Sequence, residues 1–373
     1  MSYYIYHHPH WPQFSWDEAG LSPLLGEVRY AQGRIRGRME ALGFSVRSEA
    51  MLQTLTQDVL KSTEIEGELL DADQVRSSIA RRLGLDIAGL IPADRDVEGV
   101  VEMMLDATQR YKEPLTEERL FNWQASLFPT GRSGMYPILT STWRDNAKGP
   151  MQVVSGPLGR ERVHFQAPDA SLLEAEMRRF LAWFNSEQEL DPVLKAGVAH
   201  LWFVTLHPFD DGNGRVARAI TDLQLARAEQ SSQRYYSMSA QIRQERSAYY
   251  AILERTQKGP LDITPWLDWF LSCLHSALHL AEAKLETVLE RARFWDVHAA
   301  TPLNERQRLL IKRLQEGFVG KLTSSKWAKI AKCSQDTAGR DIQDLIRKGI
   351  LVKEPGGGRS TSYALVSHPD RCD

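Results

Sequence analysis

The chain has 373 residues, enough for two or three domains, and its 42% hydrophobic and 25% charged residues are typical of a globular protein that folds in water. A net charge of −2 gives the whole chain no bias toward nucleic acid, and three widely spaced cysteines exclude a disulfide framework or a zinc ribbon. The first residues lack the pattern of a signal peptide, and no stretch is long and apolar enough to span a membrane. We therefore expect a cytoplasmic protein without membrane contact.

Apolar residues at three- and four-residue spacing predict a mostly α-helical fold. We expect residues 1–44 to form an N-terminal helical extension, in which Ser22 caps a helix with Pro23 in its first turn. The next helix is expected at about residues 47–67 and is closed by Gly67. Further helices are expected at residues 71–84, 94–111, 116–128, 171–186, 191–209, 215–230, 244–257 and 264–295.

The helical pattern stops between Pro129 and Pro168, where glycine and proline are frequent. Two short β-prone runs at residues 151–154 and 163–166 flank a turn sequence. This arrangement predicts a β-hairpin inserted between the helices.

The segment LHPFDDGNGRVAR, residues 206–218, lies between two of the expected helices. Pro208 stops the first helix, and Gly212 and Gly214 allow a positive φ with no side chain in the way. Successive N–H groups in such a turn form a nest for an anion, and the following helix adds the positive end of its dipole. The turn therefore predicts a phosphate-binding loop.

Side chains of the same loop fit a polyphosphate with its metal ion. The Asn213 amide can donate to phosphate oxygens, Arg215 and Arg218 offer two guanidinium forks, and the Asp211 carboxylate suits Mg²⁺. A neutral His207 at the edge of the nest could take a proton from a hydroxyl that attacks phosphorus. Together these residue types favour nucleotidyl or phosphoryl transfer over a plain helix–turn–helix corner with a capping histidine.

The sequence HPFDDGNGRVAR resembles the signature of Fic domains, without departures. The resemblance implies that His207 is the base and Asp211 the Mg²⁺ ligand, and that Phe209 anchors the loop in the core. Asp210 has no role in the signature, so we expect a helix cap or a solvated charge. The phosphates would be bound by Gly212, Asn213, Gly214, Arg215 and Arg218.

The resemblance covers about residues 45–290 and implies a Fic helical core, with a domain at residues 45–295. Fic domains mostly transfer AMP from ATP to a Ser, Thr or Tyr hydroxyl of a target protein. Self-modification and a homodimer are further implications. Alternatives within the family are transfer of another nucleotide, of a phosphoryl group or of phosphocholine.

The sequence KSTEIEGE resembles the inhibitory motif of the family, which is a Ser or Thr, three residues, Glu, and Gly or Asn. Ser62 and Glu66 are four residues apart and share one helix face. The resemblance implies that Glu66 pairs with Arg218 and keeps the ATP γ-phosphate from its productive position. It also implies that Glu66 can help to remove AMP from a modified target.

The expected hairpin lies where the family has a flap that aligns the target by strand addition. An ordinary surface hairpin is the alternative. His164 is expected as an exposed strand residue, and Tyr249 and Tyr250 either wall the nucleotide pocket or pack in the core. His275 and His279 have the spacing of a zinc site but no evident acidic or cysteine partner. The candidate docking residues of the flap are Met151, Val153, Val154 and Val163.

Residues 302–369 read as three helices and a glycine-tipped β-ribbon, which predicts a winged helix-turn-helix domain. The tail from residue 302 carries 14 Lys and Arg against 8 Asp and Glu, a net charge of +6. A DNA-binding regulator with a nucleotide-sensing Fic core is therefore the alternative function, and a protein-docking or dimer module is a second use of such a domain. Candidate DNA contacts are Lys326, Lys329, Lys332, Gln335, Thr337, Arg340, Gln343 and Arg359, whereas phosphate repulsion is expected from Asp336, Asp341 and Asp344.

Overall fold

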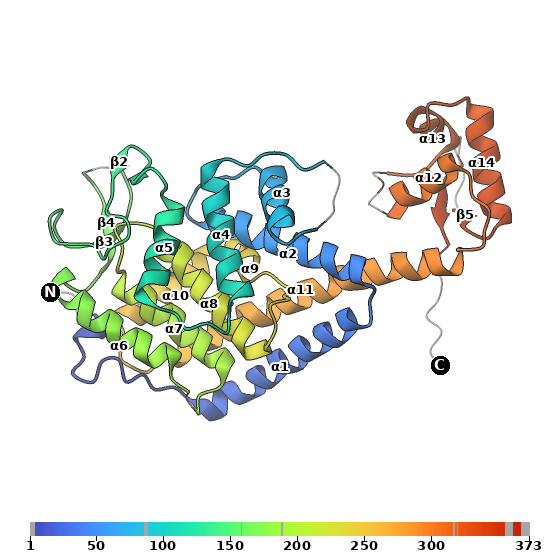
Figure 1. Ribbon diagram of the computed structural model, residues 1–373. Coiled ribbons are helices and arrows are strands. Elements are labelled where there is room, and N and C mark those ends of the chain that lie inside the picture. Colours follow the sequence, from blue (N-terminus) through green and yellow to red (C-terminus); the bar gives the residue numbers. More distant parts are fainter. Residues whose placement is uncertain are drawn as a thin grey trace. The chain divides into compact units, whose positions relative to one another are not determined.

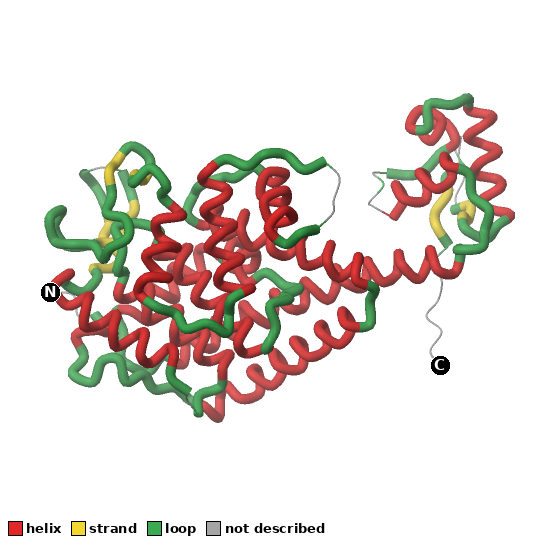
Figure 2. The backbone as a smooth tube through the Cα atoms, viewed as in Figure 1, coloured by secondary structure: helices red, strands yellow, loops and turns green. Residues whose placement is uncertain are grey.

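The computed structural model describes residues 4–85, 89–157, 159–187, 189–315, 318, 320–354 and 361–366. The chain forms two compact units, Met1–Ala283 and Lys284–Asp373. Helices make up most of both units, and the strands occur as short antiparallel pairs (Figure 2). The domain limits expected from the sequence stay predictions.

The first unit is a helical assembly (Figure 1). Two short 3₁₀ helices, η1 (Ile5–His7) and η2 (Ala170–Leu172), accompany its α-helices. These are α1 (Glu18–Glu40), α2 (Phe44–Ile65), α3 (Ala72–Arg82), α4 (Arg95–Gln109), α5 (Glu117–Leu127), α6 (Leu173–Asn185), α7 (Pro192–Leu206), α8 (Asn213–Glu229), α9 (Met238–Gln244), α10 (Arg246–Gln257) and α11 (Thr264–Val297), which continues into the second unit.

Helix α7 forms the centre of this unit. Asp191 caps its start by accepting hydrogen bonds from Val193 N and Leu194 N, and Pro192 occupies the first turn, where its missing N–H costs nothing. Every residue from Val193 to Leu206 is buried, as expected for a helix that is apolar on all sides. Helix α8 packs along α7 and is buried over most of its length. The loop between these two helices is therefore held by the best-packed part of the core.

The start of α1 differs from the sequence prediction. The helix begins at Glu18, and its cap is Asp17, whose Oδ1 accepts from Gly20 N at 3.0 Å. Ser22 is thus not the cap, and Pro23 lies inside the helix. The capping carboxylate satisfies an N–H of the first turn, so the helix starts before the proline.

The predicted hairpin is present as β3 (Gln152–Ser155) paired with β4 (Arg162–Gln166), with a bulge between Val153 and Val154. We call this pair the flap. A second, smaller ribbon precedes it and consists of β1 (Arg132–Ser133) and β2 (Tyr136–Pro137). The sequence analysis did not predict this ribbon.

The second unit contains α12 (Glu305–Gln315), α13 (Ser324–Ile330), α14 (Gln335–Arg347), β5 (Leu351–Lys353) and β6 (Tyr363–Leu365). Trp327, Ile342 and Leu345 lie at the centre of its separate core. The expected ribbon tip, including Arg359, lies outside the described residues. The order of three helices and an antiparallel pair agrees with the sequence prediction, and the winged-helix assignment stays a prediction.

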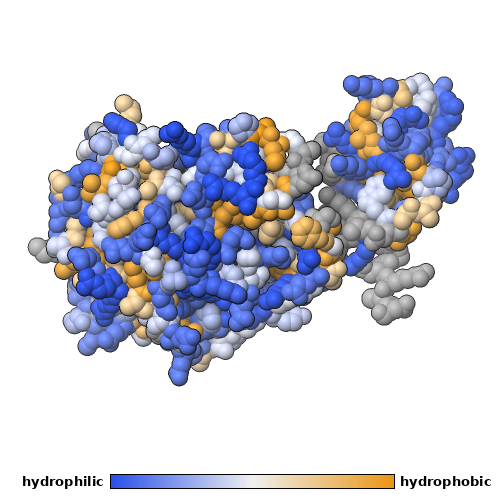
Figure 3. All heavy atoms as spheres, viewed as in Figure 1, coloured by the Kyte–Doolittle hydropathy of each residue, from blue (hydrophilic) through white to orange (hydrophobic). Residues whose placement is uncertain are grey.

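Hydrophilic residues cover most of the face shown in Figure 3. Among the described residues, none of the helices is both long enough and apolar enough to cross a lipid bilayer.

Close packing of α4 on α5 depends on Gly99, because a Cβ at this position would lie 1.8 Å from Ser126 O. We expect Gly99→Ala to lower the free energy of unfolding by about 1–3 kcal/mol through overpacking. The control is Gly26→Ala in α1, where no described atom lies within 4 Å of the added Cβ; it should raise stability by up to about 1 kcal/mol. Urea unfolding measures both, and a Gly99→Ala protein as stable as the parent would contradict the packing argument.

Candidate active site

The loop between α7 and α8 is shaped by residues that end one helix and start the next. His207 follows α7 in a left-handed conformation with φ 49°. Gly212, with φ +87°, precedes the first turn of α8, a conformation that favours glycine. The Asn213 side chain closes the loop, because its Oδ1 accepts from Phe209 N at 2.9 Å and its Nδ2 donates to Phe209 O at 2.8 Å. The amide expected to meet phosphate is thus used on the loop's own backbone in this structure.

His207 is oriented as a proton acceptor. Its Nδ1 lies 3.3 Å from Val204 O, and because a carbonyl can only accept, Nδ1 carries the proton. Nε2 therefore keeps its lone pair. Burial lowers the pKa of His207 below its usual value, and the hydrogen bond to Val204 O opposes this only in part. The imidazole is neutral at physiological pH, as a general base must be.

Arg144 holds the backbone beneath His207. Its Nε donates to His207 O at 2.7 Å, its Nη2 donates to Pro168 O at 2.6 Å, and its backbone N donates to Pro208 O at 2.9 Å. The side chain is buried. The bonds to His207 O and Pro208 O satisfy carbonyl groups just beyond the end of α7, and the bond to Pro168 O joins this point to the segment that precedes η2. Arg144 stands alone in an irregular segment, so no sequence pattern marked it.

The Arg218 guanidinium is buried and contacts the end of α2. Its Nε donates to Ser62 Oγ at 2.8 Å, and its Nη2 donates to Ser62 O at 2.9 Å and to Glu66 Oε1 at 2.7 Å. The contact between Glu66 and Arg218 that the motif implied is thus present, and an inhibitory role for it stays a prediction. Gly67 has φ +91° and ends α2, which directs Glu66 toward the loop.

The carboxylates of Glu66 and Glu68, which follow the end of α2, lie against the first turn of α8. A Cβ at Gly214 would lie 2.2 Å from Glu66 Oε1, so only glycine lets the carboxylate approach this closely. Glu68 Oε2 lies 2.9 Å from Arg215 Nη1, and the Arg215 guanidinium also lies over the Phe128 ring, 5.0 Å from its centroid. Each of the two arginines of the loop is therefore paired with one carboxylate. The sequence analysis missed Glu68, which lies two residues beyond the inhibitory motif.

The two aspartates of the loop face different partners. Asp211 Oδ1 accepts from Gly212 N at 2.6 Å, and its Oδ2 accepts from Ser133 Oγ of β1 at 2.5 Å. Asp210 was expected as a helix cap or a solvated charge, and this was wrong. Its Oδ2 accepts from Lys148 Nζ at 2.8 Å and from Leu139 N at 3.2 Å, and its side chain is 9% exposed. Asp210 thus ties the loop to the segment that leads into the flap.

Comparison with known proteins points to a family for the segment that contains this loop. Residues 114–225 match the family model described as Fic/DOC family. The Protein adenylyltransferase Fic of Drosophila virilis is 38% identical over 261 residues, which cover 69% of this chain and 47% of the relative. This chain contains a Fic/DOC family domain at residues 114–225. The same-named protein of Drosophila mojavensis is 28% identical over 269 residues, covering 71% of the chain and 47% of the relative. The chain spans about half the length of these two relatives.

Solved structures confirm the mostly helical Fic fold. A Fic family protein from Desulfovibrio desulfuricans G20 has a TM-score of 0.55 at 20% identity, over 97% of this chain and 100% of the other. A Fic domain containing signaling protein from Bacteroides thetaiotaomicron has a TM-score of 0.50 at 20% identity, over 71% of this chain and 96% of the other. Residues 4–85 also match a model described as a domain of unknown function (DUF4172).

The flap of the Fic core presents two of its four expected docking residues to solvent. Val154 and Val163 pair across the strands and are 47% and 41% exposed. Met151 and Val153 instead pack against a buried cluster that contains Phe165. The β1–β2 ribbon adds exposed apolar surface through Met135 and Tyr136.

The N-terminal segment covers part of one flap edge. Ala167 N donates to Met151 O at 2.9 Å, and the next pair along the strands is Gln152 with Gln166. Hydrogen-bonded and non-hydrogen-bonded pairs alternate in an antiparallel ladder, so the backbone N–H and C=O groups of Gln152 and Gln166 point outward from the hairpin. Tyr6 Oη donates to the outward Gln166 O at 2.9 Å. The edge of β4 is therefore occupied at this position.

His164 is half-buried rather than exposed, which corrects the sequence prediction. Its Nδ1 lies 2.6 Å from Glu254 Oε2 on α10, and its Nε2 lies 2.6 Å from Ser155 Oγ on β3. The imidazole thus links both strands of the flap to the helical core.

Tyr249 and Tyr250 have different environments. Tyr249 is buried, and its hydroxyl hydrogen-bonds to His200 Nε2 at 2.8 Å. Tyr250 is half-buried under the Arg246 guanidinium, which donates from Nε to Ile65 O at 2.8 Å. Tyr249 therefore packs in the core, whereas Tyr250 lies close to the end of α2.

A buried ionic cluster fixes α2 against α8. Arg234 Nη1 lies 2.5 Å from Asp222 Oδ1 of α8, and Arg234 Nη2 lies 3.7 Å from Asp58 Oδ2 of α2. Ser237 Oγ donates to Asp58 Oδ1 at 2.5 Å. Burial and the neighbouring Asp222 raise the pKa of Asp58. Removing one partner of such a buried cluster lowers the free energy of unfolding by several kcal/mol, so the position of α2 is strongly constrained.

The pair of His275 and His279 has its Nε2 atoms 3.0 Å apart. Contrary to the sequence analysis, an acidic neighbour exists, since Glu27 Oε2 lies 3.7 Å from His275. Among the described residues, no three His, Cys, Asp or Glu side chains group as metal ligands.

His200 makes folding sensitive to acid. Burial, followed by the nearby Arg218, lowers its pKa to about 3, whereas an unfolded chain binds this proton near pH 6.5. Between these two pH values the unfolded state therefore binds more protons than the folded state. The free energy of unfolding then falls as pH falls through this window, by up to about 1.4 kcal/mol per pH unit from this residue.

Urea unfolding at about pH 7.5 and about pH 5 tests this point. We expect His200→Gln, which can keep bonds to Thr221 and Tyr249, to lose less stability on acidification than the parent. Equal losses in the two proteins would contradict the assignment.

Proposed function

We propose that this chain is a protein adenylyltransferase, which moves AMP from ATP to a Ser, Thr or Tyr hydroxyl of a target protein. The observation that carries the proposal is the position of a neutral His207, with Nε2 free to accept, at the end of a glycine-rich turn that leads into α8. The name of the Drosophila relatives supports the same activity.

The nucleotide phosphates would bind at the first turn of α8. The Gly214 N–H and the dipole of α8 favour an anion there, and the Gly212 N–H can join them once it leaves Asp211 Oδ1. Arg215 and Arg218 can each offer a guanidinium once their carboxylate partners leave. Asp211 suits Mg²⁺, which commonly takes one carboxylate together with substrate phosphates. Mg²⁺ bound there would neutralise charge on the leaving phosphates.

The transfer follows from this placement. The target hydroxyl oxygen attacks the α-phosphorus, His207 Nε2 takes the hydroxyl proton, and the bond from the α-phosphorus to the bridging oxygen breaks, so that pyrophosphate leaves. Arg144 keeps the His207 backbone in position during this step. Catalysis would come mainly from positioning and from charge stabilisation.

Glu66 supports an autoinhibited state. Its carboxylate lies against Gly214 and is bonded to Arg218, in the volume that an outer phosphate would need. Phosphate and carboxylate therefore compete for one buried guanidinium. We also propose that Glu66 helps to remove AMP from a modified target.

The flap would bind the target as an added strand. The edge of β3 is the better candidate, because Tyr6 already occupies Gln166 O on β4. Val154 and Val163 would then contact target side chains. We also propose self-modification and a homodimer, which only the family resemblance implies.

Labelled ATP tests the activity. Purified parent, Glu66→Gly and His207→Ala are incubated with Mg²⁺ and ATP labelled at the α- or the γ-phosphate, with and without cell lysate. We expect α-label on protein to rise at least about tenfold in Glu66→Gly, equivalent to about 1.4 kcal/mol of lost competition, and to vanish in His207→Ala. A chase with unlabelled ATP shows whether the parent releases AMP faster than Glu66→Gly.

The matched control is Glu68→Gln, which frees Arg215 but leaves Glu66 in place. Glu68 is 52% exposed, so its effect should be the smaller one. Label from the γ-position would indicate phosphoryl transfer instead. Equal labelling by parent and Glu66→Gly would contradict the inhibitory role of Glu66. No labelling by any of the proteins would contradict the proposed adenylyltransferase activity.

The pH dependence follows from His207. Because burial lowers its pKa, the acid limb of the rate profile should have its midpoint below about pH 6.5. The neutral base is then present at all higher pH values. Initial rates of Glu66→Gly between about pH 5 and pH 8 measure this limb, and a midpoint above pH 6.5 would argue against His207 as the base.

A further inference from the structure

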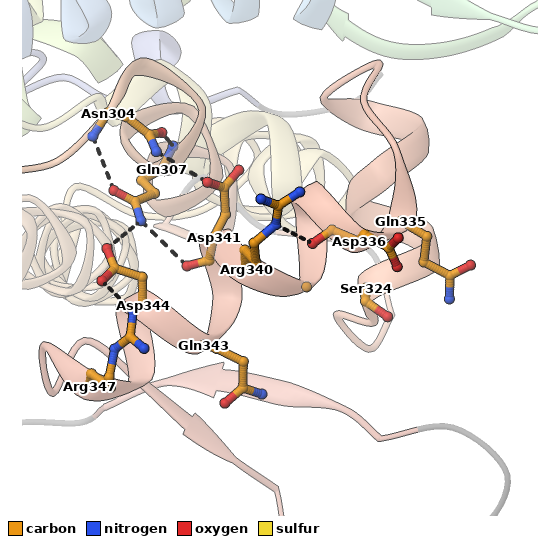
Figure 4. A pocket seen from close by; sticks show the side chains of 11 residues that line it. Asn304, Gln307, Ser324, Gln335, Asp336, Arg340, Asp341, Gln343, Asp344 and Arg347 are labelled. Atoms are coloured by element: carbon orange, nitrogen blue, oxygen red, sulfur yellow. Dashed lines mark hydrogen bonds and ion pairs between the residues drawn. The ribbon is translucent and has the colours of Figure 1, made fainter.

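One exposed side of α14 in the second unit lines an open hollow of 860 Å³ (Figure 4). Residues of α12 and α13 complete its lining. The residues at 335, 339, 343 and 347 are spaced by four and share one side of the helix. We call this surface the α14 face, defined by Gln335, Asp336, Gly339, Arg340, Gln343 and Arg347.

Gly339 has no packing reason to be glycine. It lies inside α14, and no described atom lies within 4 Å of a Cβ added there. A glycine inside a helix costs about 1 kcal/mol relative to alanine. No described contact inside the unit requires a glycine at this position. A partner that approaches the helix backbone closely would require one, because a larger side chain would be in its way.

Two of the carboxylates expected to repel phosphate are already neutralised. Asp341 is bonded to Arg306 Nε at 2.8 Å. Asp344 pairs with Lys348 and accepts from Gln307 Nε2 at 2.9 Å, and these contacts lower its pKa. Both carboxylates join α14 to its neighbours in the fold, which corrects their interpretation from sequence.

The charge that remains favours a polyanion. Arg340 and Arg347 are exposed on the α14 face, with Asp336 as its exposed acidic residue. Arg347 Nη2 also lies 3.1 Å from Asp344 Oδ1, in an exposed pair that is weak enough for a polyanion to compete for the guanidinium. Residues 302–373 carry 14 Lys and Arg against 8 Asp and Glu. Arginine and glutamine are also the side chains that form paired hydrogen bonds with guanine and adenine in the major groove.

We propose that the α14 face binds duplex DNA in the major groove and selects a base sequence. Arg340 and Arg347 would contact guanine, Gln335 and Gln343 would contact adenine, and Gly339 would let base edges approach the helix. This proposal does not rest on AMP transfer, because binding needs neither ATP nor His207.

The test uses the full chain and a library of duplex DNA of about 30 base pairs with a randomised centre. After selection, fluorescence anisotropy measures binding of the enriched duplex at about 50 mM and about 200 mM salt. We expect one enriched sequence, affinity that falls with salt, and a loss of about 5- to 100-fold in Arg340→Ala.

The decisive variant is Gly339→Leu, which should remove specific binding while thermal stability stays the same or rises. Its control is Gly33→Leu, an exposed glycine inside α1 that also has no described atom within 4 Å of an added Cβ. No enriched sequence, or unchanged binding by Gly339→Leu, would overturn the proposal. Sedimentation that shows an oligomer of the parent, lost in Gly339→Leu, would assign the face to a second copy and would overturn it as well.

Discussion

The buried Arg218 guanidinium is the constraint on which the candidate site depends. A buried cation needs partners, and here Ser62 and Glu66 at the end of α2 supply them. This requires α2 to lie against α8. The Arg234 cluster makes the same connection between Asp58 and Asp222 and so fixes the helix that carries Glu66. The segment that carries Glu66 is thus built into the core rather than attached to it.

The loop between α7 and α8 keeps its shape because other groups of the protein pair with its charged side chains. Glu66 lies against Gly214, Glu68 pairs with Arg215, and Ser133 bonds to Asp211. An anion-binding turn with unpaired arginines would be costly to bury, so internal carboxylates stabilise the folded chain. In the proposed function, a nucleotide would have to displace these carboxylates.

Long-range contacts join the remaining parts of the site. Tyr6 reaches the flap from the start of the chain, His164 connects the flap to α10, and Asp210 connects the loop to Lys148. Arg144 holds His207 from an irregular segment. A flap of two strands is only marginally stable alone, so these contacts determine where it lies relative to His207.

The sequence by itself indicated most of the helices, the hairpin of the flap and the family of the loop motif, because helical periodicity, turn residues and HPFDDGNGRVAR are all local patterns. It did not predict α9 or the cap of α1. It also marked Glu66, whose motif is local, but not Glu68 or Arg144, which gain meaning only from partners far along the chain. Only the tertiary structure decided that Tyr249 is a core residue, that Asp210 is paired, and that Asp341 and Asp344 are neutralised. The physical reason is that burial and ion pairing depend on which segments meet in space, and single-sequence spacing carries no record of that.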